Sequence, residues 1–286
     1  MTIEAAHREL VNGLTPEFGK GEANQLARIV FEDAFGITNF LRRQELTPNQ
    51  LSQLKEIQER ILAHEPVQYI LGMTYFYDLK FKVNPAVLIP RSETEELVAW
   101  ILEDHSTNQN LRILDIGTGS GCIPIALKAK APNYQITAVD ISTAAISIAK
   151  ENTEINQVEV NFQELDILNK ESWEKLPSYE IIVSNPPYIP LREKDLMGKS
   201  VLNHEPSLAL FVTNEDPLIF YRTIIEFSKK QLTNGGWLYF ETNEFNATEV
   251  EALLFKAGYF DIEKRQDLQG KDRMLKARFG TKLHNS

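Results

Sequence analysis

The sequence of 286 residues contains a single cysteine, Cys122. One cysteine excludes an internal disulfide and any cysteine-rich metal site, so Cys122 is interpreted as a small buried apolar residue. No stretch approaches the roughly 18 uninterrupted apolar residues that a membrane-spanning helix needs. The first residues show no basic segment followed by an apolar run, so no signal peptide is expected. These absences predict a cytoplasmic protein with no metal ion and no membrane partner.

Positive charge is also scarce in this chain. It carries 30 basic and 40 acidic residues, which give a net charge of −10. Tight binding of nucleic acid without sequence preference usually requires a basic face. No run of Lys or Arg is longer than a pair such as Arg42–Arg43. A protein or a small molecule is therefore favoured over naked nucleic acid as the substrate.

The N-terminal region, up to about residue 72, has the apolar spacing of helices. Its clearest signal is a helix start, where Thr47 can cap, Pro48 can fill the first helical position and Gln50 completes a capping box. A helical bundle that only packs and a substrate-recognition domain are both consistent with this pattern. The local sequence does not separate the two.

Residues 75–90 change in character, because their apolar positions alternate or cluster around Asp78 and the turn signal Asn84-Pro85. This pattern predicts a β-hairpin that links two domains. A second capping box, formed by Ser92 and Glu95, then predicts a helix. Arg91 would lie at the start of that helix.

From about residue 111 the pattern alternates between strand and helix, which predicts a mainly parallel sheet covered by helices. The tail contains two strand-like segments with no helical pattern between them, so these are expected to pair antiparallel at one edge. The predicted strands are residues 112–116, 136–140, 158–162, 180–184, 236–241, 259–264 and 273–279, and the predicted helices are residues 122–130, 143–156 and 219–230.

The ends of the first three of these strands suit a nucleotide ligand, which open α/β sheets bind at the carboxyl ends of their strands. The first strand runs into a glycine-rich turn, Gly117-Thr118-Gly119-Ser120-Gly121. Its spacing differs from the dinucleotide fingerprint, and no Lys-Ser/Thr pair follows it to form a P-loop. Asp140 can accept hydrogen bonds from two ribose hydroxyls, and Asp166 from an adenine amino group. Each residue alone is also typical of an ordinary loop, but their succession indicates a ligand site.

The fourth strand ends at Asn185-Pro186-Pro187-Tyr188. Prolines cannot donate to a sheet ladder, so the strand must stop there. The Asn185 side-chain oxygen and the Pro186 backbone carbonyl can together accept both hydrogens of a planar NH2 group, on which the Tyr188 ring can stack. This geometry suits alkylation of an amide or amino nitrogen. Taken alone, the tetrapeptide is also consistent with an ordinary strand-ending turn.

In combination, these motifs resemble the PrmC/HemK family of class I S-adenosylmethionine-dependent methyltransferases over nearly the whole chain. Members of this family methylate the side-chain amide of the glutamine in the Gly-Gly-Gln motif of bacterial peptide chain release factors. The segments that carry the resemblance are Glu65–Gly72, Val87–Arg91, Glu93–Glu95, Asp115–Gly121, Asn185–Tyr188, Glu205–Pro206 and Asp267–Gly270.

The resemblance implies three parts of the chain. Residues 1–74 would form a helical domain that recognises the release factor, and residues 75–90 a β-hairpin linker. Residues 91–286 would form the catalytic domain, built on a seven-stranded, mainly parallel, Rossmann-like sheet.

The resemblance also implies roles for single residues toward S-adenosyl-L-methionine and the substrate. Gly117, Thr118, Gly119, Ser120 and Gly121 would pass the methionine part of the cofactor. Asp140 would hold the ribose, and Asp166 and Ile167 would flank the adenine. Asn185, Pro186, Pro187 and Tyr188 would hold the substrate glutamine close to the cofactor, and Arg91 and Thr94 would line the pocket.

Three positions depart from the usual pattern of the family. Ile167 stands where an aromatic residue often follows the adenine-side acid, so aliphatic packing is expected there. Ser92 stands where a proline usually follows the arginine. A glutamine often follows the acid that corresponds to Glu241, and whether Asn246 substitutes for it is open.

The predicted function is therefore methylation of release factor glutamine by a monomeric, cytoplasmic enzyme of translation termination. One alternative is a methyltransferase that acts on a glutamine of a ribosomal protein. A second alternative is an adenine amino-methyltransferase that acts on nucleic acid, against which the acidic balance of the chain argues.

Overall fold

The computed structural model describes residues 1–41 and 44–281, so the Arg42–Arg43 pair lies outside the described residues. The chain divides into two compact units. The first comprises Met1–Met73 with Met197–His204, and the second comprises Thr74–Leu196 with Glu205–Ser286. Within the described part of the chain, no helix has both the length and the apolar character required to cross a membrane.

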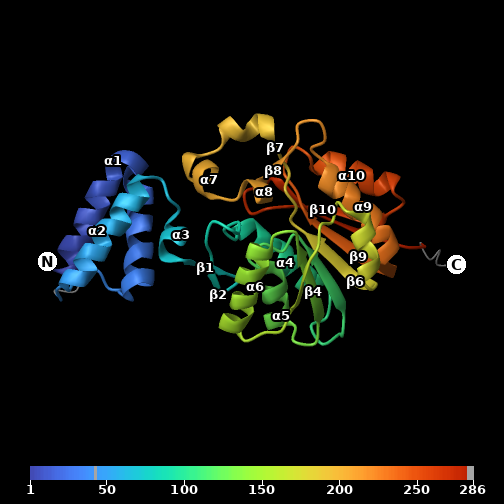
Figure 1. Cartoon of the computed structure of the whole chain (residues 1–286), viewed down its shortest axis with the longest axis horizontal. Helices are drawn as coiled ribbons and strands as arrows, with labels where there is room; N and C mark the ends of the chain where they lie inside the picture. Colours follow the sequence, from blue (N-terminus) through green and yellow to red (C-terminus); the bar gives the residue numbers. More distant parts are fainter. Residues whose placement is uncertain (42–43, 282–286) are drawn as a thin grey trace. The chain divides into compact units, whose positions relative to one another are not determined.

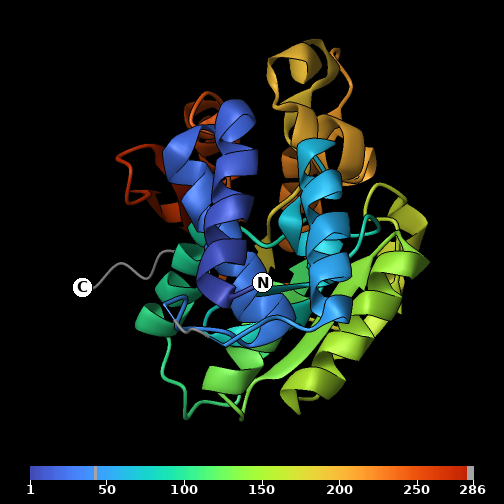
Figure 2. The ribbon, with the colours of Figure 1, turned by 90° about the vertical axis from the view of Figure 1, so that its left-hand side faces the viewer.

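The first unit is helical, as the sequence predicts (Figure 2). The predicted capping box is confirmed: the Thr47 side chain accepts from the Gln50 backbone N–H, and the Gln50 side chain accepts from the Thr47 N–H. Gly19 has positive φ and breaks the first helix into two segments, which pack on the second helix around one apolar core. The elements are α1 (Ile3–Ile29), the π-helix η1 (Val30–Ala34), α2 (Pro48–Leu62), α3 (Val67–Leu71) and α7 (Lys199–His204).

The second unit is built on a seven-stranded sheet with the strand order β10-β11-β9-β6-β3-β4-β5 (Figure 1). All pairs from β9 to β5 are parallel, whereas β10 and β11 are antiparallel at one edge. The predicted fold class and the antiparallel tail are therefore confirmed. The strands are β3 (Arg112–Ile116), β4 (Gln135–Asp140), β5 (Asn161–Glu164), β6 (Tyr179–Ser184), β9 (Leu232–Glu241), β10 (Phe260–Gln266) and β11 (Asp272–Arg278).

Helices lie on both faces of the sheet (Figure 1). Alternate residues of the central strands face two apolar cores, one on each side of the sheet. Ile181 packs with α4 (Ser92–Asp104) and α5 (Cys122–Lys130), whereas its neighbour Ile182 packs with α9 (Ile219–Gln231) and α10 (Ala247–Lys256). Strands that are covered on both faces must be apolar throughout, which explains the unbroken apolar runs of the sequence. The helix α6 (Thr143–Asn156) connects β4 to β5.

The region between β6 and α9 consists of short elements that the sequence pattern did not indicate. It begins directly after the Asn-Pro-Pro-Tyr turn, and two of its segments pair as a small parallel sheet. Besides α7, the elements are β7 (Ile189–Pro190), the 3-10 helix η3 (Leu191–Leu196), α8 (Ser207–Leu210) and β8 (Phe211–Val212). A further 3-10 helix, η2 (Lys170–Lys175), precedes β6.

Two local predictions are wrong. Ser92 does not cap α4, because Arg91 occupies the cap position and the Glu95 carboxylate instead accepts from the Tyr77 backbone N–H at 2.7 Å. The strand predicted from residue 158 begins only at Asn161. Val158 and Val160 pack on the core in the segment between α6 and β5. Their alternating apolar pattern is therefore the same as that of a strand.

The β-hairpin, formed by β1 (Met73–Phe76) and β2 (Leu79–Lys82), is tied to α6 by the buried side chain of Asn152. The Asn152 Oδ1 accepts from the Lys82 N–H at 2.6 Å, and its Nδ2 donates to the Lys82 carbonyl at 3.0 Å. The same Nδ2 donates to the Ser120 carbonyl at 2.9 Å. One carboxamide thus connects the hairpin to the glycine-rich turn.

Replacement of Asn152 by alanine should therefore destabilise the second unit by roughly 2–4 kcal/mol, because it leaves several buried backbone groups unpaired. Asn156→Ala, one helical turn further on, removes a more exposed bond to the Lys80 carbonyl and should cost less than about 1 kcal/mol. Urea denaturation of both variants measures the difference. Equal losses would contradict the bridging role of Asn152.

Candidate active site

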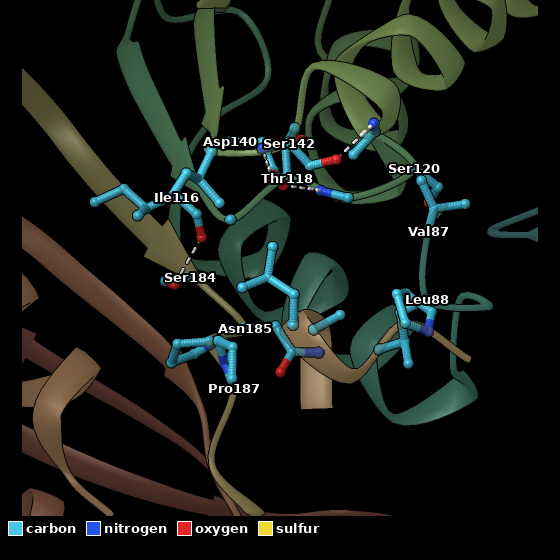
Figure 3. Close-up of a pocket in the computed structure, with 18 of the residues that line it drawn as sticks. Val87, Leu88, Ile116, Thr118, Ser120, Asp140, Ser142, Ser184, Asn185 and Pro187 are labelled. Atoms are coloured by element: carbon cyan, nitrogen blue, oxygen red, sulfur yellow. Dashed lines mark hydrogen bonds between the residues drawn. The ribbon is translucent and has the colours of Figure 1, made fainter. Parts of the chain in front are cut away.

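A cavity of about 380 Å³ opens at the carboxyl ends of the parallel strands in the second unit (Figure 3). Most of the site residues predicted from the sequence line this cavity, although they come from segments that are far apart in the sequence. These are Arg91, Thr94, Gly117, Thr118, Gly119, Ser120, Asp140, Asp166, Ile167, Asn185, Pro186 and Pro187.

Two predicted residues, Gly121 and Tyr188, are not part of the cavity lining. Gly121 caps α5 with a φ of 80°, and a Cβ at this position would come within 3.1 Å of the Ala149 Cβ. It therefore permits close packing of α5 on α6. Tyr188 packs against the core that lies under α9.

The glycine-rich turn and Asp140 are joined by hydrogen bonds. One Asp140 oxygen accepts from the Gly119 N–H at 2.8 Å, and the other accepts from the Ser142 N–H at 2.9 Å. Burial raises the pKa of the Asp140 carboxyl, and these backbone donors oppose that shift. The carboxylate is held at the cavity with lone pairs left to accept from a ligand.

The cavity wall beside Asp166 is mostly apolar. The Asp166 Oδ1 accepts from the Leu168 N–H at 2.8 Å, and the Trp173 Nε1 donates to the Ile167 carbonyl at 2.9 Å, so both residues are fixed. Ile167 lies in the cavity wall, as the sequence predicts. The sequence did not indicate that Phe220 of α9 also lines this cavity, because its position depends on how α9 packs.

Asn185 directly follows the carboxyl end of β6, next to Thr94 of α4. Its Nδ2 donates to the Thr94 Oγ1 at 3.3 Å. The preceding Ser184 hydroxyl donates to the Ile116 carbonyl at 2.7 Å (Figure 3). The second bond ties the turn after β6 to the end of β3. A carboxamide and the glycine-rich turn thus share one cavity.

Two ion pairs give a structural role to Glu205–Pro206 and Asp267–Gly270, two segments that carry the family resemblance. The Arg91 Nη2 donates to both oxygens of the buried Glu205 carboxylate, at 2.6 and 2.8 Å, so the guanidinium anchors the segment before α8. Asp267 accepts from the Lys271 N–H at 3.0 Å and from the Arg273 Nε at 3.2 Å, which closes the turn between β10 and β11. Buried charges require such partners.

The structure shows where Asn246 lies, although its role stays a prediction. Its Oδ1 accepts from the Asn243 N–H at 3.1 Å, within the loop that leads into α10. It is not among the cavity-lining residues. In the described part of the chain, no group of three or more His, Cys, Asp or Glu residues could hold a metal ion.

Comparison with known proteins places these features in one family. Residues 16–72 match the PrmC N-terminal domain, and residues 94–204 match the methyltransferase small domain. The release factor glutamine methyltransferase of Flavobacterium psychrophilum is 41% identical over 290 residues, which cover 98% of this chain and 100% of that protein. That of Bacteroides thetaiotaomicron is 44% identical over 225 residues, which cover 79% and 80% of the two chains. The chain belongs to the release factor glutamine methyltransferase family.

Solved structures agree on the fold. A methyltransferase from Pyrococcus furiosus matches with a TM-score of 0.53 at 18% identity, covering 79% of this chain and 100% of that one. The predicted family resemblance is thus confirmed, and the chain is a methyltransferase. The roles of single site residues stay predictions.

In this family member, Asp115 is a buried acid with no hydrogen-bond partner among the described residues. It lies on β3 and is fully buried. Burial raises the pKa of Asp115 to about 7. The nearby Thr118 hydroxyl moderates this shift without reaching hydrogen-bond geometry, and the Asp140 charge adds to it.

The Asp115→Asn variant should be more stable than the wild type at high pH. The folded-state pKa of about 7 lies above the unfolded value of about 4, so the wild-type fold loses stability as pH rises through this range. The variant lacks this titration, and its relative gain should grow from pH ~4 to ~7 and then level off, at a few kcal/mol. Urea denaturation between pH 4 and 8.5 measures it, with the exposed Asp195→Asn as control. A difference independent of pH would contradict the buried, unpaired state of Asp115.

Proposed function

We propose that this chain transfers a methyl group from S-adenosyl-L-methionine to the side-chain amide nitrogen of the glutamine in the Gly-Gly-Gln motif of bacterial peptide chain release factors. The observation that carries the proposal is the position of Asn185. Its carboxamide lies in the same cavity as the glycine-rich turn and Asp140. Membership of the release factor glutamine methyltransferase family supports the choice of a protein glutamine over a nucleic-acid base.

The residues of the cavity fit S-adenosyl-L-methionine. Asp140 can accept from the ribose hydroxyls, Asp166 from the adenine amino group, and the wall containing Ile167 and Phe220 can contact the adenine faces. The backbone of the glycine-rich turn leaves room for the methionine part, since a Cβ at Gly117 or Gly119 would meet no described residue within 4 Å. When bound, the cofactor supplies an already activated methyl group on a positively charged sulfur.

The chemical difficulty then lies in the amide nitrogen, whose lone pair is delocalised into the carbonyl group. The Asn185 Oδ1 and the Pro186 carbonyl accept the two amide hydrogens, which orients the nitrogen toward the methyl group. Fixing two reactants in this way can lower a barrier by several kcal/mol. The same two acceptors stabilise the positive charge that develops on the nitrogen as the methyl–sulfur bond breaks, until one amide proton leaves to solvent.

The remaining predicted residues have supporting roles in this proposal. Pro187 stiffens the turn, and Tyr188, which lies outside the cavity lining, anchors the turn on the core that lies under α9. Arg91 shapes the cavity rim through its ion pair with Glu205. The helical unit recognises the release factor, and the enzyme acts as a cytoplasmic monomer.

Asn185→Ala should lower methyl transfer by at least about 100-fold, because it removes an acceptor that acts on the reacting nitrogen. The Kd for the cofactor should change by less than about threefold. Incubation with labelled cofactor, followed by mass spectrometry of purified release factors, ribosomal proteins and DNA, measures both the rate and the modified residue. Full turnover by the variant would exclude the role of Asn185. Label on a ribosomal protein or on DNA, but not on release factor glutamine, would overturn the proposed substrate.

Asp140→Ala should have the converse effect, since it removes the acceptor for the ribose without touching the Asn185 turn. We expect the cofactor Kd to rise by roughly 10- to 100-fold, as for the loss of charged hydrogen bonds. Isothermal titration of the wild type, Asp140→Ala and Asn185→Ala separates the two sites. An unchanged Kd for Asp140→Ala would exclude the ribose assignment.

A further inference from the structure

Behind Asn185 lies a chain of buried polar groups. The Thr94 Oγ1 donates to the Glu241 Oε2 at 2.6 Å, and the same oxygen accepts from the Asn185 Nδ2 at 3.3 Å. Thr94 and Glu241 are 2% and 3% exposed, so both are shielded from water. β9 pairs with β6 so that Phe240 lies opposite Ser184, which brings the next residues, Glu241 and Asn185, side by side.

The direction of these hydrogen bonds decides which way the Asn185 carboxamide faces. The NH2 and oxygen of a carboxamide are almost equal in size, so packing alone separates the two orientations poorly. An ionised Glu241 can only accept, so the Thr94 hydroxyl must donate its hydrogen to it. That hydroxyl then presents lone pairs to Asn185, which can be met only by the Asn185 NH2. The Asn185 oxygen is consequently left for the cavity.

We propose that Glu241, acting through the Thr94 hydroxyl, is a positioning residue that keeps the Asn185 oxygen turned toward the substrate amide. The inference rests on the proposed function, because the oxygen matters only if the substrate presents an NH2 group. A reversed Asn185 would place its own NH2 against that of the substrate, where two donors face each other.

Protonation of Glu241 removes this control. A neutral carboxyl can donate to Thr94, whose hydroxyl hydrogen is then free to turn toward the Asn185 oxygen and stabilise the reversed orientation. Burial raises the pKa of Glu241 to about 7, while the bond from Thr94, the Arg273 charge and the Asn185 side chain oppose the shift and the Glu93 charge adds to it. The Glu241 charge also contributes to the raised pKa values of Cys122, Tyr188 and Tyr221, which are raised mainly by burial. The Tyr221 hydroxyl donates to the Glu241 backbone carbonyl.

The test compares steady-state and single-turnover rates of Glu241→Gln, Thr94→Val and Thr94→Ser with those of the wild type. Glutamine keeps the size of Glu241 but can donate as well as accept, so kcat should fall about tenfold, which corresponds to a 10:1 preference for the reversed carboxamide. The Kd for the cofactor and the KM for the release factor should change less than threefold. Thr94→Val should lower kcat as much as Glu241→Gln does, and the double variant should lower it no further than either single variant. Thr94→Ser, which keeps the hydroxyl, should recover most of the kcat that Thr94→Val loses.

The pH profile supplies a readout that a purely structural role would not change. The wild-type kcat should rise as pH increases through about 7, and Glu241→Gln should lack this rise. Glu226→Gln, an exposed glutamate on α9 paired with Lys170, is the matched control and should keep the wild-type profile. If Glu241→Gln does not fold, Thr94→Val, which should also lack the rise, carries the test.

Two kinds of failure are distinguishable. A wild-type enzyme that transfers no methyl group to release factor glutamine overturns the proposed function. A wild-type enzyme that does so, while Glu241→Gln and Thr94→Val keep its kcat and its pH profile, overturns the positioning role alone. Losses that add in the double variant also overturn it, since they would show that the two residues act independently.

Discussion

The site depends on the parallel pairing of β3 with both of its neighbours. Ile116 at the end of β3 lies opposite Val139 of β4 and Ser184 of β6. The three strands therefore end at the same level of the sheet. The next residue is the start of the glycine-rich turn after β3, Asp140 in β4 and Asn185 after β6. The loops after these strands lie close together, because the hydrogen bonds between the strands align their carboxyl ends.

Around this edge, polar groups are buried in pairs that each connect distant segments. Arg91 joins α4 to the segment at Glu205, and Arg273 closes the turn at Asp267. Asn152 holds β2 and the glycine-rich turn on α6. A buried charge or carboxamide without such partners is costly, so each pair restricts the loop that it holds. Asp115 is the contrast, since its carboxyl is buried with no hydrogen-bond partner in the described part of the chain.

Much of this architecture was predictable from local pattern. Unbroken apolar runs indicated buried parallel strands, and Thr47 with Gln50 indicated a helix start that the structure contains. The pattern failed where a residue serves a distant partner. Glu95 bonds to Tyr77 rather than to the start of its own helix, and Val158 packs as a loop residue on the core. In both places the residue type matched the local rule, but a tertiary contact used it differently.

The alternation of strands and helices, the family and the identity of the residues at the strand ends can all be read from the sequence. These follow from short-range periodicity and from motifs of adjacent residues. The folded structure was needed to show that Thr94, Asn185 and Glu241, which come from three separate segments, form one chain of hydrogen bonds. It also decided that Gly121 and Tyr188 lie outside the cavity lining. Spacing along the chain carries no record of which side chains meet, since that depends on how sheet and helices pack.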